Sequence, residues 1–383
     1  MKKIVFVSNT ASLTGAPYVL LLFIKWLRAS QKSLIIDVVF LEGGYLMNDF
    51  IEFTDTIYNY SDVTIKKALF PKLYSYTKRK LLGKGSRKQV FIDSISNQDY
   101  DLIYANTIAS VAFATEIKKN STNNPKLVAH IHELNITIKE YLPNFDNYIP
   151  QIDQFISVSN LVMLNLNLNW NIDPLKNHLV YAFSDRIVHN LERHYVSIDS
   201  SRVFQIGAAG HVNTRKGYDL FIQVARYIKQ HYPDVKIRFT WVGYISHLHR
   251  LSIEADLEKS NLQEVVFFVG EQVEPETYFQ MFDVFLMTSR EDPFPLVCIE
   301  VGKIGVPIIC FEKATGTAEV INNGGGFVVP YLDCAAMAER VINYYNDDLA
   351  LIKDGELNKV NFAKYRSKVM AEELYNVLIG DLL

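Results

Sequence analysis

Short, continuous runs of apolar residues alternate with longer amphipathic segments along nearly the whole chain. Such runs are typical of strands buried on both faces of a parallel sheet, and the segments between them are typical of covering helices. One helical pattern, from Tyr18 to Leu27, closely follows the first run. The pattern predicts an α/β fold with strands at residues 4–8, 34–41, 101–105, 126–131, 154–158, 178–183, 203–209, 236–242, 265–269, 284–288, 307–311 and 326–329.

A polar stretch divides these strands into two series. Residues 184–202 show no clear strand pattern, and 383 residues exceed the size of a typical single domain. We predict two doubly wound, Rossmann-like domains, residues 1–183 and 203–357, joined by the linker 184–202. The tail, 358–383, has a helical pattern and is expected to pack back across one of the domains, the N-terminal one in this assignment. Ligands bind beyond the carboxyl ends of such strands, so two facing domains predict a cleft between them.

The composition argues against several classes of protein. A formal net charge of −3 gives no global field that favours nucleic acid. Cys298, Cys310 and Cys334 lack CxxC spacing and are expected to be small buried residues in a reducing compartment. The apolar run that starts at Ile4 is too short for an export signal, and no stretch approaches the ~18 apolar residues that span a bilayer. We therefore expect a cytoplasmic protein.

One segment departs from this average charge. Between Asp62 and Asp93 there is no acidic residue, while lysines and arginines accumulate among tyrosines and leucines. A solvated helix or loop is the usual explanation of such a run. The alternative is a surface attracted to anionic lipid, where each cation contributes about 1 kcal/mol. This alternative gives residues 64–90 a contact with the inner face of the membrane.

Two carboxylates, Asp292 and Glu300, flank a Pro-braced apolar turn in the second half of the chain. Asp292 is expected on the loop that leaves strand 284–288, and Glu300 about one turn into the next helix. The N-terminal amides of that helix can hold an anion between the two acids. This layout suits a sugar nucleotide, with the sugar at one acid, the diphosphate on the amides and the ribose at the other acid. The alternative for Glu300 is a helix-surface carboxylate, but its apolar neighbours indicate partial burial with a partner.

The second half opens with a strand that runs into a small-residue loop and then into Arg215, Lys216 and Gly217. Small residues let a phosphate approach the backbone, and Lys216 supplies a charge that stabilises a diphosphate leaving group. Cations are disfavoured at a helix start, so a purely structural lysine is a poor explanation of Lys216. The run is not GxGxxG, which argues against a dinucleotide-dependent dehydrogenase.

The first half offers two further candidates. Gly15 lies in a small, polar loop, where it lets backbone amides face a ligand, and Pro17 suits a helix start. His130 and His132 lie at the end of strand 126–131, and alternation sends both side chains to the same side. A structural role is the ordinary explanation for either histidine alone. The spacing lacks the helical pattern of a zinc protease, and no metal site is predicted.

Together these residues resemble the family-4 retaining glycosyltransferases of GT-B fold, over essentially the whole chain and most closely from Gly207 to Pro330. Asp292 and Glu300 match the family's acid-x7-acid motif. The first-loop glycine, the histidine after an N-domain strand and the lysine–glycine helix start match Gly15, His132 and Arg215–Gly217. The closing motif matches residues 318–320 and 324–327. Residues 8–17 and 104–107 look like a branch of bacterial surface-polysaccharide transferases.

The resemblance implies roles for these residues. Asp292 is implied to bind donor sugar hydroxyls, Glu300 the ribose, Lys216 the phosphates, and His132 to lie near the reacting sugar. The remaining donor contacts are implied for Gly15, Arg215, Val273, Phe294, Leu296 and Val297, with Val273 beside the base through its backbone. The implied substrates are a nucleotide-diphosphate sugar and a glycan or lipid-linked acceptor. No cofactor or metal is required, because amides and cations meet the diphosphate charge.

Three positions depart from the family pattern: Asp292 where Glu is usual, Pro295 where a second glycine is usual, and His211 where an arginine is usual. Pro295 removes one N–H donor, and His211 removes a permanent cation for which Arg215 is a substitute. The expected function is a retaining glycosyltransferase in surface-polysaccharide synthesis. The alternative is a catalytically degenerate GT-B subunit that binds a sugar nucleotide or a partner transferase. A sugar-nucleotide epimerase or a phosphorylase of similar fold is a third possibility.

Overall fold

The computed structural model describes residues 2–65, 87–186 and 202–379. The chain divides into two compact units. The first unit comprises residues 1–181 and 367–383, and the second comprises residues 182–366. Most of the predicted linker 184–202 and of the basic segment 64–90 lies outside the described residues.

The first unit contains a seven-stranded parallel sheet in the order β3-β2-β1-β4-β5-β6-β7. Its strands are β1 (Lys3–Thr10), β2 (Ile35–Glu42), β3 (Thr56–Asn59), β4 (Leu102–Asn106), β5 (Lys126–Ile131), β6 (Gln154–Ser157) and β7 (Asn177–Leu179). Its helices are α1 (Gly15–Ser30), α2 (Met47–Ile51), α3 (Tyr60–Ile65), α5 (Arg87–Ser96), α6 (Ile108–Asn120), α7 (Asn135–Tyr141), α8 (Asn160–Asn169) and α16 (Ser367–Ile379), with 3-10 turns η1 (Phe145–Asn147), η2 (Ile149–Gln151) and η3 (Pro174–Lys176).

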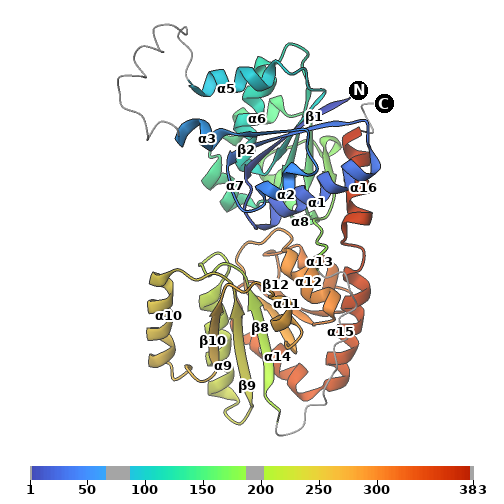
Figure 1. Cartoon of the computed structure of the whole chain (residues 1–383). Coiled ribbons are helices and arrows are strands. Elements are labelled where there is room, and N and C mark those ends of the chain that lie inside the picture. The colour runs from blue at the N-terminus through green and yellow to red at the C-terminus, as the bar shows by residue number, and fades with distance from the viewer. Residues whose placement is uncertain (1, 66–86, 187–201, 380–383) are drawn as a thin grey trace, which may run out of the picture. The chain divides into compact units, whose positions relative to one another are not determined.

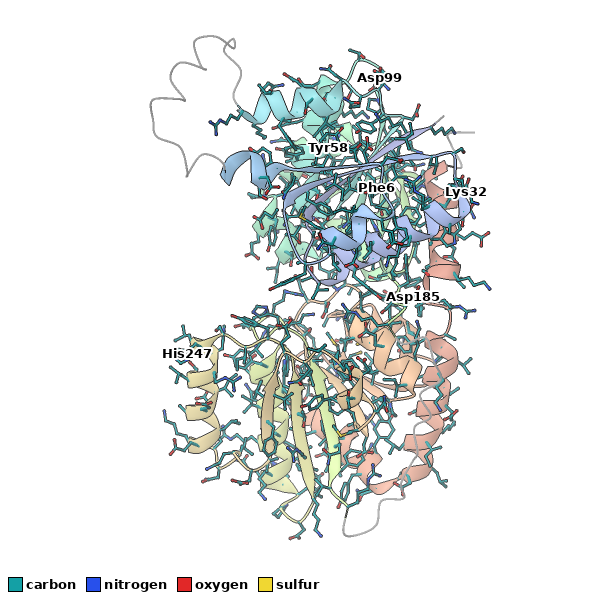
Figure 2. All side chains as sticks on the ribbon, in the orientation of Figure 1. Phe6, Lys32, Tyr58, Asp99, Asp185 and His247 are labelled. Atoms are coloured by element: carbon teal, nitrogen blue, oxygen red, sulfur yellow. The ribbon has the colours of Figure 1, made fainter. Side chains whose placement is uncertain are left out.

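The core of the first unit forms where α1 packs on the central strands. Phe6 on β1 lies 5.1 Å from Tyr104 on β4 and 6.1 Å from Phe23 on α1, measured between ring centroids. All three side chains are buried, whereas Lys32 and Asp99 lie at the surface of the same unit (Figure 2). The continuous apolar runs of β1 and β4 are therefore explained by helices on both faces of the sheet.

The second unit contains a six-stranded parallel sheet in the order β10-β9-β8-β11-β12-β13 (Figure 1). Its strands are β8 (Phe204–Ala209), β9 (Ile237–Val242), β10 (Val266–Gly270), β11 (Val284–Met287), β12 (Ile308–Phe311) and β13 (Gly326–Val329). Its helices are α9 (Tyr218–His231), α10 (His247–Lys259), α11 (Glu276–Phe279), α12 (Leu296–Ile304), α13 (Thr317–Ile321), α14 (Cys334–Asn346) and α15 (Asp348–Phe362). Both sheets thus have the doubly wound topology that the apolar runs predict.

Three details differ from the predicted elements. The edge strand β3 was not predicted, because its residues are only partly buried and form no continuous apolar run. The last strand of the first unit ends at Leu179, earlier than the predicted residue 183. The tail is not one helix: α15 ends at Phe362 and α16 begins at Ser367, where Tyr375 packs on Trp26 of α1 with ring centroids 5.6 Å apart. Within the described ranges, no helix is long and apolar enough to cross a membrane.

Candidate functional site

The loop between β11 and α12 carries the two acids of the motif. The backbone of Asp292 is held by its N–H bond to the Ala314 carbonyl, at 2.8 Å, and by a short parallel bridge to Thr315. Pro295 occupies the N-cap position of α12 with an extended conformation, so Leu296 and Val297 supply the first amides of the helix. Asp292 therefore lies before the helix and Glu300 in its second turn, as the sequence predicts.

The loop after β8 carries Lys216, two residues before α9 begins. Gly217, the N-cap residue, has φ +73°, and a Cβ atom there would lie 2.0 Å from the Thr288 carbonyl oxygen. The Thr288 hydroxyl in turn donates to the Lys216 carbonyl oxygen at 3.2 Å. Only glycine permits this approach, which joins the loop after β8 to the end of β11.

This junction brings Lys216 to Asp292, 76 residues apart in the sequence. Lys216 Nζ lies 2.5 Å from Asp292 Oδ2, and the Ser289 hydroxyl donates to the same oxygen at 3.3 Å. The side chains keep 16% and 9% of their exposure, so the ion pair is largely desolvated. The predicted phosphate-binding cation and sugar-binding acid are thus in direct contact, and both can still reach a ligand at the surface.

Two arginines strengthen the same junction. Arg215 Nη1 donates to the Glu291 carbonyl oxygen at 2.6 Å, and the Arg215 carbonyl accepts the Arg290 N–H at 2.8 Å. Arg290 forms a bidentate pair with Asp219 on the first turn of α9, at 2.9 and 2.8 Å. Burial alone raises the pKa of Asp219, but the guanidinium of Arg290 outweighs it and holds that pKa below its ordinary value. The junction is therefore built of charge-assisted bonds.

Glu300 is buried, with 3% exposure. Its Oε1 accepts the Ser184 hydroxyl at 2.9 Å and lies 3.6 Å from Arg186 Nη1. Lys303, one turn later, donates to the carbonyl oxygens of Ser184 and Tyr365 at 2.6 and 3.0 Å. Burial raises the pKa of Glu300, and Arg186, Ser184 and Lys303 oppose that rise only in part. Glu300 is a buried carboxylate with partners, as its apolar neighbours indicated.

The loops after β8 and β10 carry His211 and another predicted donor residue, Val273. Val273, in the loop after β10, is fully exposed. His211, after β8, packs its ring on Tyr244, with centroids 4.9 Å apart. Burial lowers the pKa of His211, with further lowering by His249 and the cations Lys216 and Arg215, while Glu271 opposes them. His211 therefore supplies no permanent positive charge at neutral pH.

In the first unit, His130 is the penultimate residue of β5, and His132 directly follows the strand. Their ring centroids lie 4.1 Å apart, which confirms the expected same-side alternation. Burial lowers the pKa of His132 to about 3 and holds that of His130 well below its ordinary value, so both imidazoles are neutral at neutral pH. The Tyr104 hydroxyl is hydrogen-bonded to His130 Nδ1. The pair is suited to hydrogen bonding rather than to charge.

Gly15 lies at the same carboxyl edge of the first sheet. It is the first residue of α1, so Pro17 is the third helical residue rather than the first. The next residue, Ala16, accepts a hydrogen bond from Asn106 Nδ2 at the end of β4, at 3.2 Å. Asn106 is directly opposite His130 in the sheet register. The structure thus places Gly15 and His132 in one unit, and Lys216, Asp292 and Glu300 in the other.

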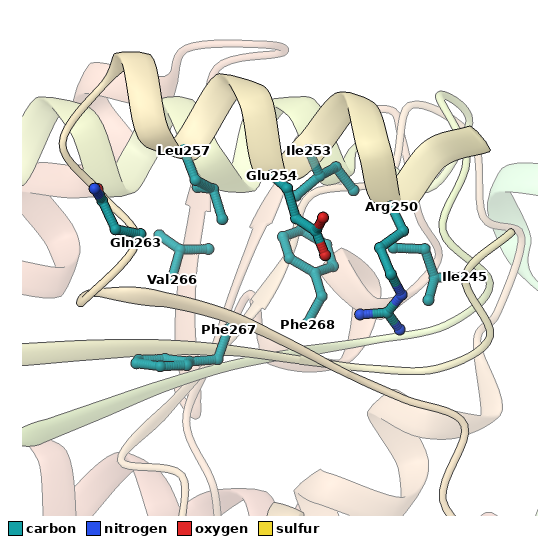
Figure 3. Close-up of a pocket in the computed structure, with 9 residues that line it drawn as sticks. All are labelled: Ile245, Arg250, Ile253, Glu254, Leu257, Gln263, Val266, Phe267 and Phe268. Carbon is teal, nitrogen blue, oxygen red and sulfur yellow. The ribbon is translucent and has the colours of Figure 1, made fainter. Parts of the chain in front are cut away.

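A pocket with a volume of about 260 Å³ lies between α10 and β10 (Figure 3). Its walls include Leu257 and Phe268, with Arg250 and Glu254 among its charged residues. None of the predicted site residues lines this pocket. Over the described part of the chain, no group of three or more His, Cys, Asp or Glu side chains is arranged to hold a metal ion.

Sequence reasoning missed the residues that hold the predicted ones in place. Ser184, Arg186 and Lys303 surround Glu300, and Glu133 accepts hydrogen bonds from the backbone N–H groups of His132 and Ile108, at 2.9 and 3.1 Å. Glu133 adjoins His132 in the sequence, so its position next to a candidate histidine was an available signal. Ser184 lies 116 residues from Glu300, and no local pattern links the two.

Residues 200–366 match the family model described as "Glycosyl transferases group 1". The match covers less than half of the chain. It lies within the second unit, 182–366, and includes Lys216, Asp292 and Glu300.

Two curated relatives are similar over shorter stretches. A D-inositol 3-phosphate glycosyltransferase of Paenarthrobacter aurescens is 25% identical over 186 residues, 47% of this chain and 45% of that protein. The Escherichia coli O-antigen biosynthesis glycosyltransferase WclY is 36% identical over 103 residues, 27% of each chain. The matched stretch thus spans less than half the length of either relative.

Solved structures show the fold over the whole chain. The Anabaena protein HepE, solved with UDP and glucose, has a TM-score of 0.77 at 16% identity and covers 99% of both chains. The S. aureus protein TarM has a TM-score of 0.72 at 15% identity, also over 99% of both chains. Identity at this level shows the fold alone, which is the GT-B type with two parallel-sheet, Rossmann-like domains.

Proposed function

We propose that the chain is a family-4 retaining glycosyltransferase, which moves a sugar from a nucleotide-diphosphate sugar to a glycan or lipid-linked acceptor in surface-polysaccharide synthesis. The observation that carries this proposal is the contact between Lys216 and Asp292 at the start of α12, inside the glycosyl transferases group 1 domain. It puts a cation, a carboxylate and the first amides of α12 within one small region, as a sugar diphosphate requires.

In the proposed reaction, groups of the protein itself balance the negative charge of the diphosphate leaving group. The bond between the anomeric carbon and the diphosphate oxygen breaks, and the acceptor hydroxyl oxygen bonds to that carbon on the same face. The acceptor proton leaves with the nucleoside diphosphate. Lys216, Arg215 and the amides of Leu296 and Val297 would meet the diphosphate charge, so the proposal is metal-independent.

In this proposal the remaining donor contacts follow the family resemblance. Asp292 binds sugar hydroxyls, Glu300 binds the ribose, and the backbone at Val273 lies beside the base. Within the described residues, Ser184 and Arg186 engage Oε1 of Glu300, and in this proposal Oε2 accepts from a ribose hydroxyl. Names of relatives support the class: WclY is an O-antigen biosynthesis glycosyltransferase, and HepE was solved with UDP and glucose.

A thermal-shift panel of UDP-, GDP- and ADP-sugars tests this function, because a ligand that binds only the native state raises its apparent stability. We expect one nucleotide class to raise the unfolding temperature and to be turned over with an acceptor pool from a surface-polysaccharide producer. Retention is read by NMR of the product anomer. If no sugar nucleotide shifts the unfolding temperature at millimolar concentration, the function is wrong.

A second function, a degenerate subunit that binds a sugar nucleotide without turnover, is favoured by one observation. Pro295 at the N-cap of α12 lacks an N–H group, and Asp292 is already neutralised by Lys216. Calorimetry that shows nucleotide binding, with no transfer to any acceptor pool, distinguishes this subunit from the enzyme. Epimerised donor or sugar 1-phosphate as the product would instead indicate the epimerase or the phosphorylase.

We also propose a peripheral location on the inner face of the membrane, through the basic segment 64–90. The support is the run of cations without an acid in the sequence, since most of this segment lies outside the described residues. Binding to anionic vesicles should weaken as salt rises. Equal binding to anionic and neutral vesicles at low salt excludes this contact.

A further inference from the structure

Helix α10 of the second unit carries an apolar surface that the proposed function does not use. Leu248 and Leu251 keep 74% and 52% of their exposure, and residues three apart share one side of a helix. Figure 1 shows α10 beside β10, the strand that ends the six-stranded sheet. Single exposed leucines are ordinary on a protein surface, whereas a contiguous apolar patch is typical of an interaction site.

The pocket of about 260 Å³ between α10 and β10 extends this surface. Its walls include the apolar side chains of Ile253, Leu257 and Phe268, and Arg250 and Glu254 project from α10 towards it (Figure 3). Residues 267–270 of β10 are only partly buried, although most of them are apolar. Proteins usually cover an apolar edge strand of this kind, so the helix, the pocket and the strand together indicate a partner.

The charges of α10 run against the order that suits an isolated helix. Arg250 lies in its first half and Glu254, Asp256 and Glu258 lie in its second half, with no acid in the first turn; Lys259 alone follows the favourable order. The helix macrodipole favours acids at the N-terminus and cations at the C-terminus, and Arg four residues before Glu is the weaker orientation of that pair. The ion pairs of the described part of the second unit all involve other side chains, so these charges are available to a partner.

A second copy of α10 in the antiparallel direction has the matching arrangement of charges. In a two-fold symmetric contact the same surface of each copy meets the other, so the first half of one helix faces the second half of its equivalent. Arg250 of each copy then approaches the acids of the other copy, whereas a parallel pair would set like charges against each other. An anionic membrane is a poorer match, because the acids of α10 outnumber its lysine and arginine.

We propose that α10 and the adjoining pocket form a symmetric contact between two copies of this chain, with the two α10 helices antiparallel. Leu248 and Leu251 of each copy pack against the pocket side of the other, and Arg250 pairs with Glu254 or Glu258 across the axis. The contact goes beyond the proposed transferase function, since α10 carries none of the predicted site residues. The 13 residues of α10 span about 20 Å, so the interface is small and the dimer is weak and concentration-dependent.

Sedimentation velocity of the full chain at about 1–300 µM covers the range in which small interfaces associate. Wild type should change from monomer to dimer as the concentration rises. Leu251→Glu should weaken the association about tenfold or more, because it removes a buried leucine twice in a symmetric contact and brings two carboxylates together. Leu349→Glu, at an 80% exposed leucine of α15, is the matched control and should associate like wild type. Neither leucine is buried within its own chain, so both variants should keep the wild-type unfolding temperature.

A mixing experiment tests the antiparallel arrangement. Arg250→Glu leaves acids in both halves of α10, and Glu254→Lys combined with Glu258→Lys leaves cations in both halves. Each of these two variants alone should associate more weakly than wild type, because like charges meet across the axis. An equimolar mixture should form a heterodimer that is tighter than the dimer of either variant, because acids then face cations in both halves.

Three results would overturn the proposal. The first is a wild-type chain that stays monomeric over the whole concentration range. The second is a dimer that Leu251→Glu and Leu349→Glu affect equally, or a mixture that associates no better than the separate charge variants, since the contact then lies elsewhere. The third is a chain that is monomeric in solution and binds neutral phosphatidylcholine vesicles unless Leu251→Glu is present, which assigns α10 to a lipid surface.

Discussion

Lys216 Nζ and Asp292 Oδ2 lie 2.5 Å apart, so two residues predicted for adjacent parts of one donor, the phosphates and the sugar, neutralise each other in the free protein. A diphosphate must compete with Asp292 for this cation, or bind it alongside the carboxylate. The contact also means that changes at Lys216 affect folding as well as catalysis. The two effects need separate measurements.

Lys216→Ala should lower donor turnover by about 10²–10³, the effect of removing one preorganised charge at a leaving group. It should also cost about 3 kcal/mol in the free energy of unfolding, because Asp292 stays buried without its cation. Turnover is measured as nucleoside diphosphate release, and stability by denaturant unfolding. Lys88→Ala is the control: it breaks an exposed ion pair with Glu116, which should cost no more than about 1 kcal/mol. Unchanged turnover in Lys216→Ala contradicts its role at the phosphates.

Gly217→Ala should destabilise the protein more than Gly270→Ala. The two glycines have similar φ values, +73° and +78°, so both substitutions place a side chain in the left-handed region, at about 1–2 kcal/mol. A Cβ at Gly270 meets only Arg250, at 3.9 Å, while a Cβ at Gly217 lies 2.0 Å from the Thr288 carbonyl oxygen. The difference in unfolding free energy isolates the contact between the loops after β8 and β11. Equal losses of unfolding free energy in the two variants would show that the close contact between Gly217 and Thr288 does not contribute to stability.

The strands and their parallel pairing were predictable because each buried strand is a continuous apolar run, as at β4 and β5. β3 was not, since an edge strand is buried on fewer sides and shows no such run. The places of Asp292, Glu300 and Lys216 on their loops and helix were predictable from local turn and helix patterns, while their roles stay predictions. The partners of Glu300 were not, because Ser184 reaches it only through tertiary folding. The same holds for Asn106 Oδ1, which is buried and has no hydrogen-bond partner among the described residues, since burial and hydrogen bonding are properties of the folded chain.

Glu300→Gln should change how stability depends on pH. Burial raises the pKa of Glu300 above its ordinary value of 4.5, so the folded protein holds this proton more tightly than the unfolded chain does. The stabilisation is full below pH 4.5 and is lost as the pH rises through the raised pKa. The stability difference, wild type minus Glu300→Gln, should therefore fall as the pH rises from 4 to 7 in denaturant unfolding. Glu116→Gln, at an exposed carboxylate, controls for the substitution. A stability difference that rises with pH would contradict the conclusion that burial raises the pKa of Glu300.

Nucleotide binding gives Glu300 a second, independent readout. Glu300→Ala should weaken the thermal shift produced by the nucleotide alone, because the predicted contact is with the ribose. Asp292→Asn should leave that shift largely intact and weaken only the extra shift produced by the attached sugar. If both variants affect the nucleotide alone and the nucleotide sugar equally, the two acids do not divide the donor between them.

His132→Gln should make the protein less sensitive to acid. Burial lowers the pKa of His132 to about 3, so the unfolded chain takes up this proton near pH 6.5 and the folded protein does not. The stabilisation is present above pH 6.5 and declines as the pH falls towards 3, by up to about 1.4 kcal/mol per pH unit for one proton. Denaturant unfolding between pH 7 and 4 should show a shallower decline in His132→Gln than in wild type, with His247→Gln at the exposed start of α10 as the substitution control. The remaining decline in His132→Gln belongs partly to His130, whose pKa burial lowers in the same direction. An equally steep decline in His132→Gln and wild type would mean that the His132 ring is open to water in the folded protein.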